Sequence, residues 1–253
     1  MLDVHMLFAG MRQLQFLYLG TYSFTLMQPA DMKKLCTVIA TMLMIYSVTA
    51  QSSKPKLLFT QSDRSSWYTF LEKSGKNADP LKVFQFENNV LHVSGQEFGY
   101  VITEESYASF HLSLEFKWGV KKFPPRENEK RDAGVLYNAH LYSGDKIWPR
   151  SLEFQIQEGD CGDFWLTDSV SMTHADTVTP KTRWFRVVKT KDTEKPNGEW
   201  NKVEVIIQDG KITHKMNGEV VNTGADPSVK SGRIVLQSEG AEIFYRNVQL
   251  VEL

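Results

Sequence analysis

The side chains best suited to chemistry lie between Trp148 and Trp165. From Leu152 to Gln157 apolar and polar residues alternate strictly. A β-strand with this pattern buries one face and presents the other, because successive strand side chains point in opposite directions. The presented face carries Glu153, Gln155 and Gln157. A carboxylate can act as a general base, and amides supply hydrogen-bond donors and acceptors together. The pattern predicts either a solvated face or a cleft for a hydroxyl-rich ligand such as a carbohydrate.

A solvated face is the ordinary interpretation, since antiparallel sheets commonly have one side in water. Solvated faces are usually rich in Lys, Glu and Thr, however, and paired glutamines fit that composition poorly. Other predicted strands also carry mixed polar groups, which favours a shared cleft: Glu115 and Lys117 on one strand, and Asn138 and His140 on another. The two flanking tryptophans can stack on the apolar face of a sugar ring, with core or edge packing as the alternative.

The elements that must position this face are strands, because two-residue periodicity dominates the chain. We expect strands within residues 83–95 (two, joined at Asn88-Asn89), 100–103, 110–118, 132–142, 152–157, 184–190, 200–222 and 232–253. Asp209-Gly210 and Asn217-Gly218 favour the positive φ angles of tight hairpins. No long amphipathic helix is evident. The charged segments 121–132 and 189–199 interrupt strands without separating domains, so residues 51–253 are predicted to form one all-β domain of two packed antiparallel sheets.

The N-terminal fifty residues read as a targeting region rather than as part of this domain. Two lysines follow Met32, an apolar run extends from Leu35 to Tyr46, and a small residue occupies position 50. This plan predicts a secretory signal peptide cleaved after Ala50, behind an upstream extension. The apolar run is shorter than the about 20 residues of a membrane span, although an uncleaved signal anchor is the alternative. After cleavage one cysteine remains, Cys161, so no internal disulfide can form, which fits a bacterial periplasm or surface.

The charge and aromatic composition of the chain indicate which classes of partner to expect. The chain has 29 basic and 30 acidic residues, and these are interspersed. A nucleic-acid-binding domain would present a basic stripe, so nucleic acid is not an expected partner. Aromatic residues make up 12% of the chain, which is compatible with sugar binding. The histidines are scattered and no HxH or HExxH motif occurs, so we name no metal ligands. A structural Ca²⁺ held by oxygens stays open, and the sequence sets no oligomeric state.

Several segments together resemble a known family. "YASFHLSLEFKW", "RDAGVLYNAHL", "WPRSLEFQIQEGDCGDFW", "GEWNKVEVIIQDGKITHKMNGEVVN" and "SGRIVLQSEGAEIFYRNVQLVEL" occur in the order and spacing of the 3-keto-disaccharide hydrolase family. The resemblance covers about residues 57–253. It implies a concanavalin A-like lectin or glucanase jelly roll, export in Bacteroidetes-type bacteria, and hydrolase or lyase action on glycosides already oxidised at C3. Matching the family's polar strand places Glu153, Gln155 and Gln157 in the cleft.

The same strand resembles, more distantly, the E-x-D-x-(x)-E strand of family-16 glycoside hydrolases. Gln155 replaces the aspartate, and Gln157 stands where a second glutamate could be. A retaining glycosidase needs two carboxyl groups about 5–5.5 Å apart, and this strand supplies one. A 3-keto sugar has an acidified proton on C2, so one general base can start elimination of the aglycone, and water adds later. We expect Glu153 to be that base, with His140 as the rival.

Further residues are assigned to substrate. Arg150 or Lys117 would stabilise the enolate oxygen, and the predicted substrate-binding set is Gln155, Gln157, Arg150, Lys117, Glu115, Trp148, Trp165, Asp163 and Asn138. Two other functions fit the same pattern. A non-catalytic carbohydrate-binding module would have the same fold and cleft without turnover. A surface adhesion domain would present an apolar, loop-rich patch instead of a polar groove.

Overall fold

Alternating burial organises the strands of this protein. In β7 (Phe110–Lys122) every second side chain from Phe110 to Trp118 is buried, and those between are partly exposed. The computed structural model describes residues 54–142 and 144–253, and none of these residues lies in a helix. The expected upstream extension and signal peptide, residues 1–50, lie outside the described residues. Within the described ranges no helix is present that could cross a lipid bilayer.

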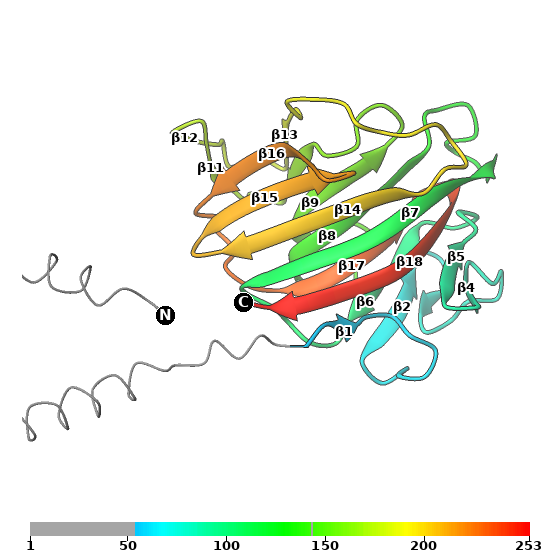
Figure 1. Cartoon of the computed structure of the whole chain (residues 1–253). Coiled ribbons are helices and arrows are strands. Elements are labelled where there is room, and N and C mark those ends of the chain that lie inside the picture. Colours follow the sequence, from blue (N-terminus) through cyan, green and yellow to red (C-terminus); the bar gives the residue numbers. More distant parts are fainter. Residues whose placement is uncertain (1–53, 143) are drawn as a thin grey trace, which may run out of the picture. The chain divides into compact units, whose positions relative to one another are not determined.

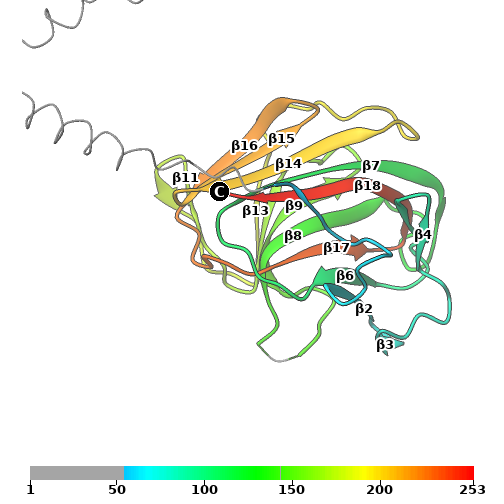
Figure 2. The same cartoon turned by 60° about the horizontal axis from the view of Figure 1, so that its bottom comes forward.

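Two antiparallel sheets pack face to face (Figures 1 and 2). The ten-stranded sheet has the order β12 (Thr177–Val178), β11 (Thr173–His174), β16 (Glu219–Ala225), β15 (Lys211–Met216), β14 (Asn201–Gln208), β7, β18 (Ala241–Glu252), β5 (Val90–Val93) and β4 (Phe84–Glu87), with β1 (Lys56–Leu57) also paired to β18. The eight-stranded sheet has the order β13 (Trp184–Val187), β10 (Phe164–Thr167), β9 (Arg150–Gln157), β8 (Asp132–His140), β17 (Arg233–Ser238), β6 (Gly99–Thr103), β2 (Trp67–Leu71) and β3 (Gly75–Lys76). The predicted jelly-roll sandwich is confirmed.

The core fills the space between the two sheets. Leu114 and Phe116 of β7 and Phe154 and Ile156 of β9 are fully buried in it. Burying each such side chain contributes about 1.5–3 kcal/mol. His214 also lies in this core, where its Nε2 is 2.8 Å from the Tyr137 hydroxyl. Burial lowers the pKa of His214 to about 3, so it is a neutral core residue.

The predicted hairpins form where turn chemistry requires them. Asp209 (φ 50°) and Gly210 (φ 75°) join β14 to β15, and Asn217 (φ 52°) and Gly218 (φ 88°) join β15 to β16. Asn88 and Asn89, also left-handed at φ 49° and 62°, join β4 to β5. Asparagine and glycine adopt these angles at little steric cost.

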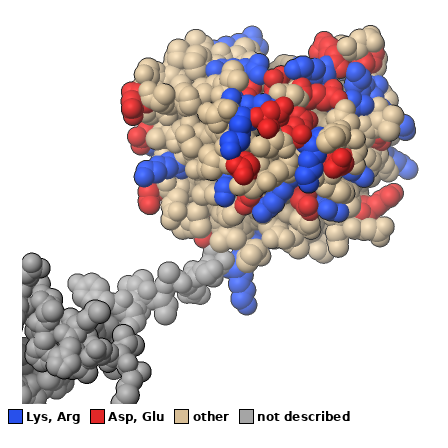
Figure 3. All heavy atoms as spheres, turned by 45° about the horizontal axis from the view of Figure 1, so that its top comes forward, with Lys and Arg blue, Asp and Glu red and all other residues tan. Residues whose placement is uncertain are grey.

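The distribution of strands between sheets differs from one sequence expectation. Glu115 and Lys117 were expected to share a cleft with the β9 face, but β7 pairs with β14 and β18 in the ten-stranded sheet. Their side chains alternate with core residues and therefore point away from the interior. Alternation specifies which residues share a face, whereas it does not specify which sheet a strand joins. Opposite charges are interspersed on the face shown in Figure 3.

Candidate functional site

A pocket of about 540 Å³ opens on the outer face of the eight-stranded sheet. The side chains of β9 that alternate with core residues form its floor. The lining residues are Arg126, Asp132, Trp148, Glu153, Gln155, Gln157, Trp165, Arg183, Trp184, Gln237 and Glu239. Glu153, Gln155 and Gln157 are therefore neighbours in one pocket, as are the two tryptophans that flank the strand in sequence.

Strand register arranges the floor in rows. Glu153 is paired with Trp165 of β10, Gln155 with Gly134 of β8, and Gln157 with Asp132. The Gln157 amide donates a hydrogen bond of 2.8 Å to Asp132 Oδ2. This register brings Trp165 of β10 and polar side chains of β9 and β8 to the same place.

Gly134 creates the space in which the floor side chains converge. A Cβ built on Gly134 would lie 2.0 Å from Glu153 Oε1 and 2.2 Å from Gln237 Oε1. The carboxyl group from β9 and the amide from β17 thus meet above a residue that has no side chain. Among the described residues, no protein group donates to Gln237 Oε1, Gln155 Oε1 or Asp132 Oδ1. An unsatisfied buried polar atom costs about 1–3 kcal/mol, so this floor suits a ligand that brings hydroxyl donors.

The pocket contains three carboxyl groups whose pKa values are raised. Burial raises the pKa of Glu153 well above its ordinary range, and the negative charges of Glu239 and Asp132 add to the effect. Burial and the charge of Asp132 raise the pKa of Glu239 to about 7. Burial also raises the pKa of Asp132, against the opposing effect of Arg126. Glu239, whose pKa lies near neutral pH, is suited to acid–base chemistry.

Arg126 is the cation that balances these acids. Its guanidinium donates to Asp132 Oδ2 and lies 4.0 Å from Glu239 Oε2. It comes from the charged segment between β7 and β8, which the sequence indicated only as a loop. A fixed guanidinium beside a row of acceptors can hold an oxygen on which negative charge develops.

Indole rings form one wall of the pocket. Trp148 and Trp184 meet edge to face, with ring centroids 5.6 Å apart and planes at 89°. Trp148 Nε1 donates to Glu239 Oε1 at 2.5 Å, which orients the ring. Arg183 lies over the Trp184 ring, 5.5 Å from its centroid. The pocket therefore combines an acidic and amide floor with an aromatic wall, as a saccharide ring requires.

Six predicted site residues do not line this pocket. The β8 strand has a bulge between Tyr137 and His140, where Asn138 adopts φ 49°. The bulge shifts the phase of the strand, so Asn138 donates to Val229 O inside the protein and the His140 ring stacks on Tyr142. Arg150 shares the core-facing phase of Leu152 and donates to Asp168 O.

The other three residues contact charged or aromatic partners elsewhere in the fold. Asp163 is fully buried and accepts hydrogen bonds from Arg186 Nε (2.5 Å) and the Lys189 backbone (2.7 Å). On the other sheet, Glu115 accepts from Arg246, and Lys117 lies 5.1 Å from the Trp200 ring centroid. These contacts give the three residues structural partners of their own.

Six lining residues were missed from the sequence: Arg126, Asp132, Arg183, Trp184, Gln237 and Glu239. For two of them a signal was present. In "RIVLQSEG" Gln237 alternates with the buried Leu236, and Glu239 continues the same phase. The expectation that one carboxylate serves the site therefore needs correction.

Across residues 54–142 and 144–253, no group of three or more His, Cys, Asp or Glu side chains is placed to hold a metal ion.

The fold and this pocket define a carbohydrate-related jelly-roll protein. The chain belongs to the family of the 3-keto-alpha-glucoside-1,2-lyase-like domain, whose model matches residues 54–251. No curated protein shows significant sequence similarity to the chain.

Solved structures share the fold at low sequence identity. A candidate glycosyl hydrolase from Parabacteroides distasonis is 20% identical, with a TM-score of 0.53 over 79% of this chain and 94% of that chain. The carbohydrate-binding module CBM66 from Bacillus subtilis is 11% identical, with a TM-score of 0.52 over 74% and 96%. LamAcat from Zobellia galactanivorans is 8% identical, with a TM-score of 0.52 over 81% and 98%. At these identities the similarity concerns the fold.

Proposed function

We propose that the pocket binds glycosides already oxidised at C3 and releases their aglycone by elimination. The observation that carries the proposal is the buried carboxyl group of Glu153, which lies among amide acceptors beside an indole wall. Membership of the family supports the substrate class. A buried carboxylate has a high proton affinity, which suits the removal of a carbon-bound proton that a neighbouring ketone has acidified.

The proposed elimination has two steps, and addition of water follows as a third. Glu153 acts in its deprotonated form, which its raised pKa makes strongly basic. It removes the C2 proton, and the electron pair of that C–H bond forms an enolate with the C3 ketone. The enolate then collapses to a C1–C2 double bond while the bond from C1 to the aglycone oxygen breaks. The leaving oxygen takes that electron pair and a proton from Glu239, whose pKa of about 7 leaves a share of it protonated. Water then adds to the double bond: its oxygen bonds to C1 while the Glu239 carboxylate takes a proton from it, and Glu153 returns its proton to C2, which completes net hydrolysis.

Arg126 and the floor amides would stabilise the enolate. Arg126 takes the role that the sequence suggested for Arg150 or Lys117, because it is a cation that lines the pocket. Gln155 and Gln237 each have an amide group at the floor that can donate to a sugar oxygen. Donors already fixed in place stabilise developing charge more than donors that must reorganise.

Glu153→Gln tests the proposal with a matched pair of substrates, p-nitrophenyl β-glucoside and its 3-keto derivative. Wild-type protein is expected to release p-nitrophenol from the ketone only. Glu153→Gln keeps the shape of the side chain but removes the base, so release should fall by about 10²–10⁴-fold. Glu199→Gln, on an exposed loop, serves as the control and should match wild type.

Two outcomes would contradict this mechanism. Release from the unoxidised glucoside, with none from the ketone, would indicate ordinary glycosidase chemistry, for which Asp132 and Glu239 supply additional carboxyl groups. Tight binding of the ketone without any release would support a non-catalytic carbohydrate-binding module. The unsatisfied acceptors Gln155 Oε1 and Gln237 Oε1 also favour a carbohydrate-binding module, because they could bind sugar hydroxyls without any catalytic step.

A further inference from the structure

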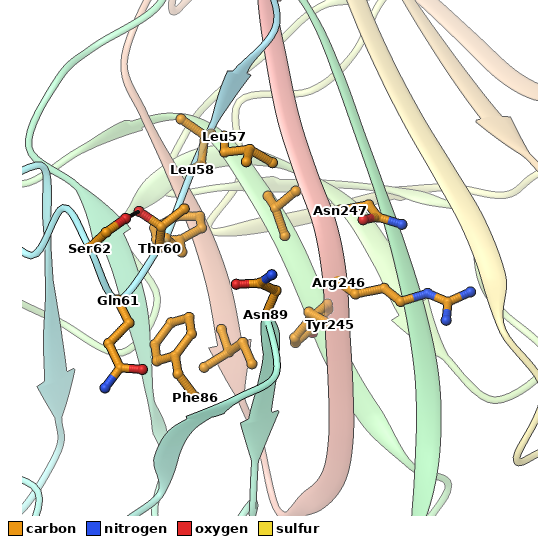
Figure 4. A pocket seen from close by; sticks show the side chains of 13 residues that line it. Leu57, Leu58, Thr60, Gln61, Ser62, Phe86, Asn89, Tyr245, Arg246 and Asn247 are labelled. Atoms are coloured by element: carbon orange, nitrogen blue, oxygen red, sulfur yellow. Dashed lines mark hydrogen bonds between the residues drawn. The ribbon is translucent and has the colours of Figure 1, made fainter.

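A second pocket, of about 510 Å³, lies at an edge of β18 and shares no lining residue with the first (Figure 4). β5 pairs with β18 as far as Arg246, and β1 pairs with it from Gln249 onward. The stretch of β18 between these pairings, Asn247 and Val248, is left to line the pocket. Leu58 N donates to Val248 O at 2.9 Å and closes one end.

A fixed aromatic ring contributes to the wall. Phe86 lies 5.1 Å from Trp67, measured between ring centroids. Trp67 is itself held by Phe59 at 6.1 Å and by the Arg64 guanidinium at 3.9 Å. This ring provides an apolar surface that needs little reordering when a ligand binds, and Leu57 lines another part of the pocket.

Amide and hydroxyl groups surround the same opening. Figure 4 shows the side chains of Thr60, Gln61, Ser62 and Asn89 around it, near Phe86. The two amides offer donors and acceptors side by side. A pocket of 300–1,000 Å³ that combines apolar walls with a few polar groups has the general character of a small-molecule site.

The backbone of the lining is unusual. Phe59, Asn89 and Asn247 line the pocket with φ values of 54°, 62° and 52°. Asparagine tolerates this left-handed conformation, but in phenylalanine it costs about 1–2 kcal/mol. Phe59 lies between β1 and the polar segment Thr60–Ser62, so the strained residue sets the direction in which that segment leaves the strand. Strain of this kind is typical of ligand-binding segments.

The lining has no free charge. Among the described residues, it contains no acidic residue and a single cation, Arg246, which is bound to Glu115 Oε2 at 2.9 Å. Arg246 also stacks against Trp200, 4.0 Å from the ring centroid, and its guanidinium points away from the opening in Figure 4. The hydroxyls of Thr60 and Ser62 have no histidine or carboxylate beside them in the lining to activate them. The pocket therefore suits binding of a neutral ligand rather than catalysis.

We propose that this second pocket is a non-catalytic binding site for a neutral saccharide unit. A pyranose has an apolar ring face that fits Phe86, and hydroxyl groups that fit Gln61 and Asn89. The site would hold a glycan chain on the protein independently of cleavage in the first pocket. It goes beyond the proposed elimination reaction and does not depend on it.

Titration with cellotriose, followed by backbone amide NMR shifts, tests this site. Shifts are expected at Thr60 and Asn89. Asn89→Gly removes the side-chain amide while permitting the left-handed φ, and should weaken binding at this pocket by about 3–10-fold. Asn88→Gly is the matched control, because Asn88 has φ 49° in the same turn and does not line the pocket.

The proposal is overturned if cellotriose shifts no amide of the lining, or if Asn89→Gly binds as tightly as Asn88→Gly. The titration is repeated on Glu153→Gln, where the shifts at Asn89 should persist. Their loss in that variant would contradict the independence of the two pockets. Absence of aglycone release would contradict the proposed reaction, whereas absence of cellotriose binding would contradict the second binding site, so the two results can be distinguished.

Discussion

Gly134 leaves space for the side chains that form the floor of the first pocket, because it has no side chain of its own. The floor groups from β9 and β17 occupy the volume that a side chain at this position would fill. We predict that Gly134→Ala lowers aglycone release from the 3-keto glucoside by at least about 100-fold, because Glu153 must move for the methyl group to fit. Steady-state kinetics on purified protein measures the loss.

The matched control for this substitution is Gly198→Ala. A Cβ at Gly198 meets no atom within 4 Å, although its φ of 89° imposes some backbone strain. This variant is expected to retain wild-type turnover, and circular dichroism should show both variants folded. Wild-type kcat in a folded Gly134→Ala protein would mean that the convergence of Glu153 and Gln237 has no bearing on catalysis.

At the scale of elements, the edge strand β13 carries part of the aromatic wall. Asp163 precedes β10 and ties β13 to it through Arg186, while Trp184 stands at the other end of β13. Removing a charge that is buried and paired destabilises by about 3–5 kcal/mol. We predict that Asp163→Asn increases hydrogen exchange across Trp184–Val187 and raises KM for the 3-keto glucoside more than it lowers kcat.

Asp160→Asn separates this effect from the general loss of an ion pair. Asp160 also contacts Arg186, at 2.9 Å, but its side chain is partly exposed and Asp163 remains in place. Its exchange rates at β13 should stay close to those of wild type. Equal loosening of β13 in both variants, or none in Asp163→Asn, would show that the buried carboxylate does not hold the strand.

The elements that could be predicted from the sequence are those whose geometry is set by residues close together in the chain. The β14–β16 hairpins were found because Asp209-Gly210 and Asn217-Gly218 fix turn geometry within two residues. The pairing of β8 with β17 joins segments far apart in the chain, so Gln237 was not linked to Glu153. The bulge at Asn138 reversed the phase that alternation had given to His140. Local periodicity locates faces, and long-range register brings the faces together.

For the molecule as a whole, the acidic floor links folding stability to pH. Glu239 has a pKa of about 7 in the folded protein, against an ordinary value of 4.5. Between these values the folded protein retains a proton that the unfolded chain has lost, so the free energy of unfolding falls as pH rises. The full penalty is present above pH 7 and is absent below the unfolded pKa. Its upper size is roughly 3 kcal/mol.

We predict that Glu239→Gln removes this penalty. Relative to wild type, the variant should gain stability steadily from pH 4.5 to 7 in urea unfolding, while the hydrogen bond from Trp148 can still be accepted by the amide oxygen. Glu115→Gln is the contrasting control, because hydrogen bonds from Arg246 lower the pKa of Glu115. That carboxylate stabilises the fold above its unfolded pKa and loses its effect as pH falls, so its variant should show no gain over this range.

Parallel pH profiles for wild type and Glu239→Gln would mean that Glu239 is already ionised at pH 5. It would then have no proton to give to a leaving aglycone at neutral pH, and the acid of the proposed elimination would have to be sought elsewhere in the pocket.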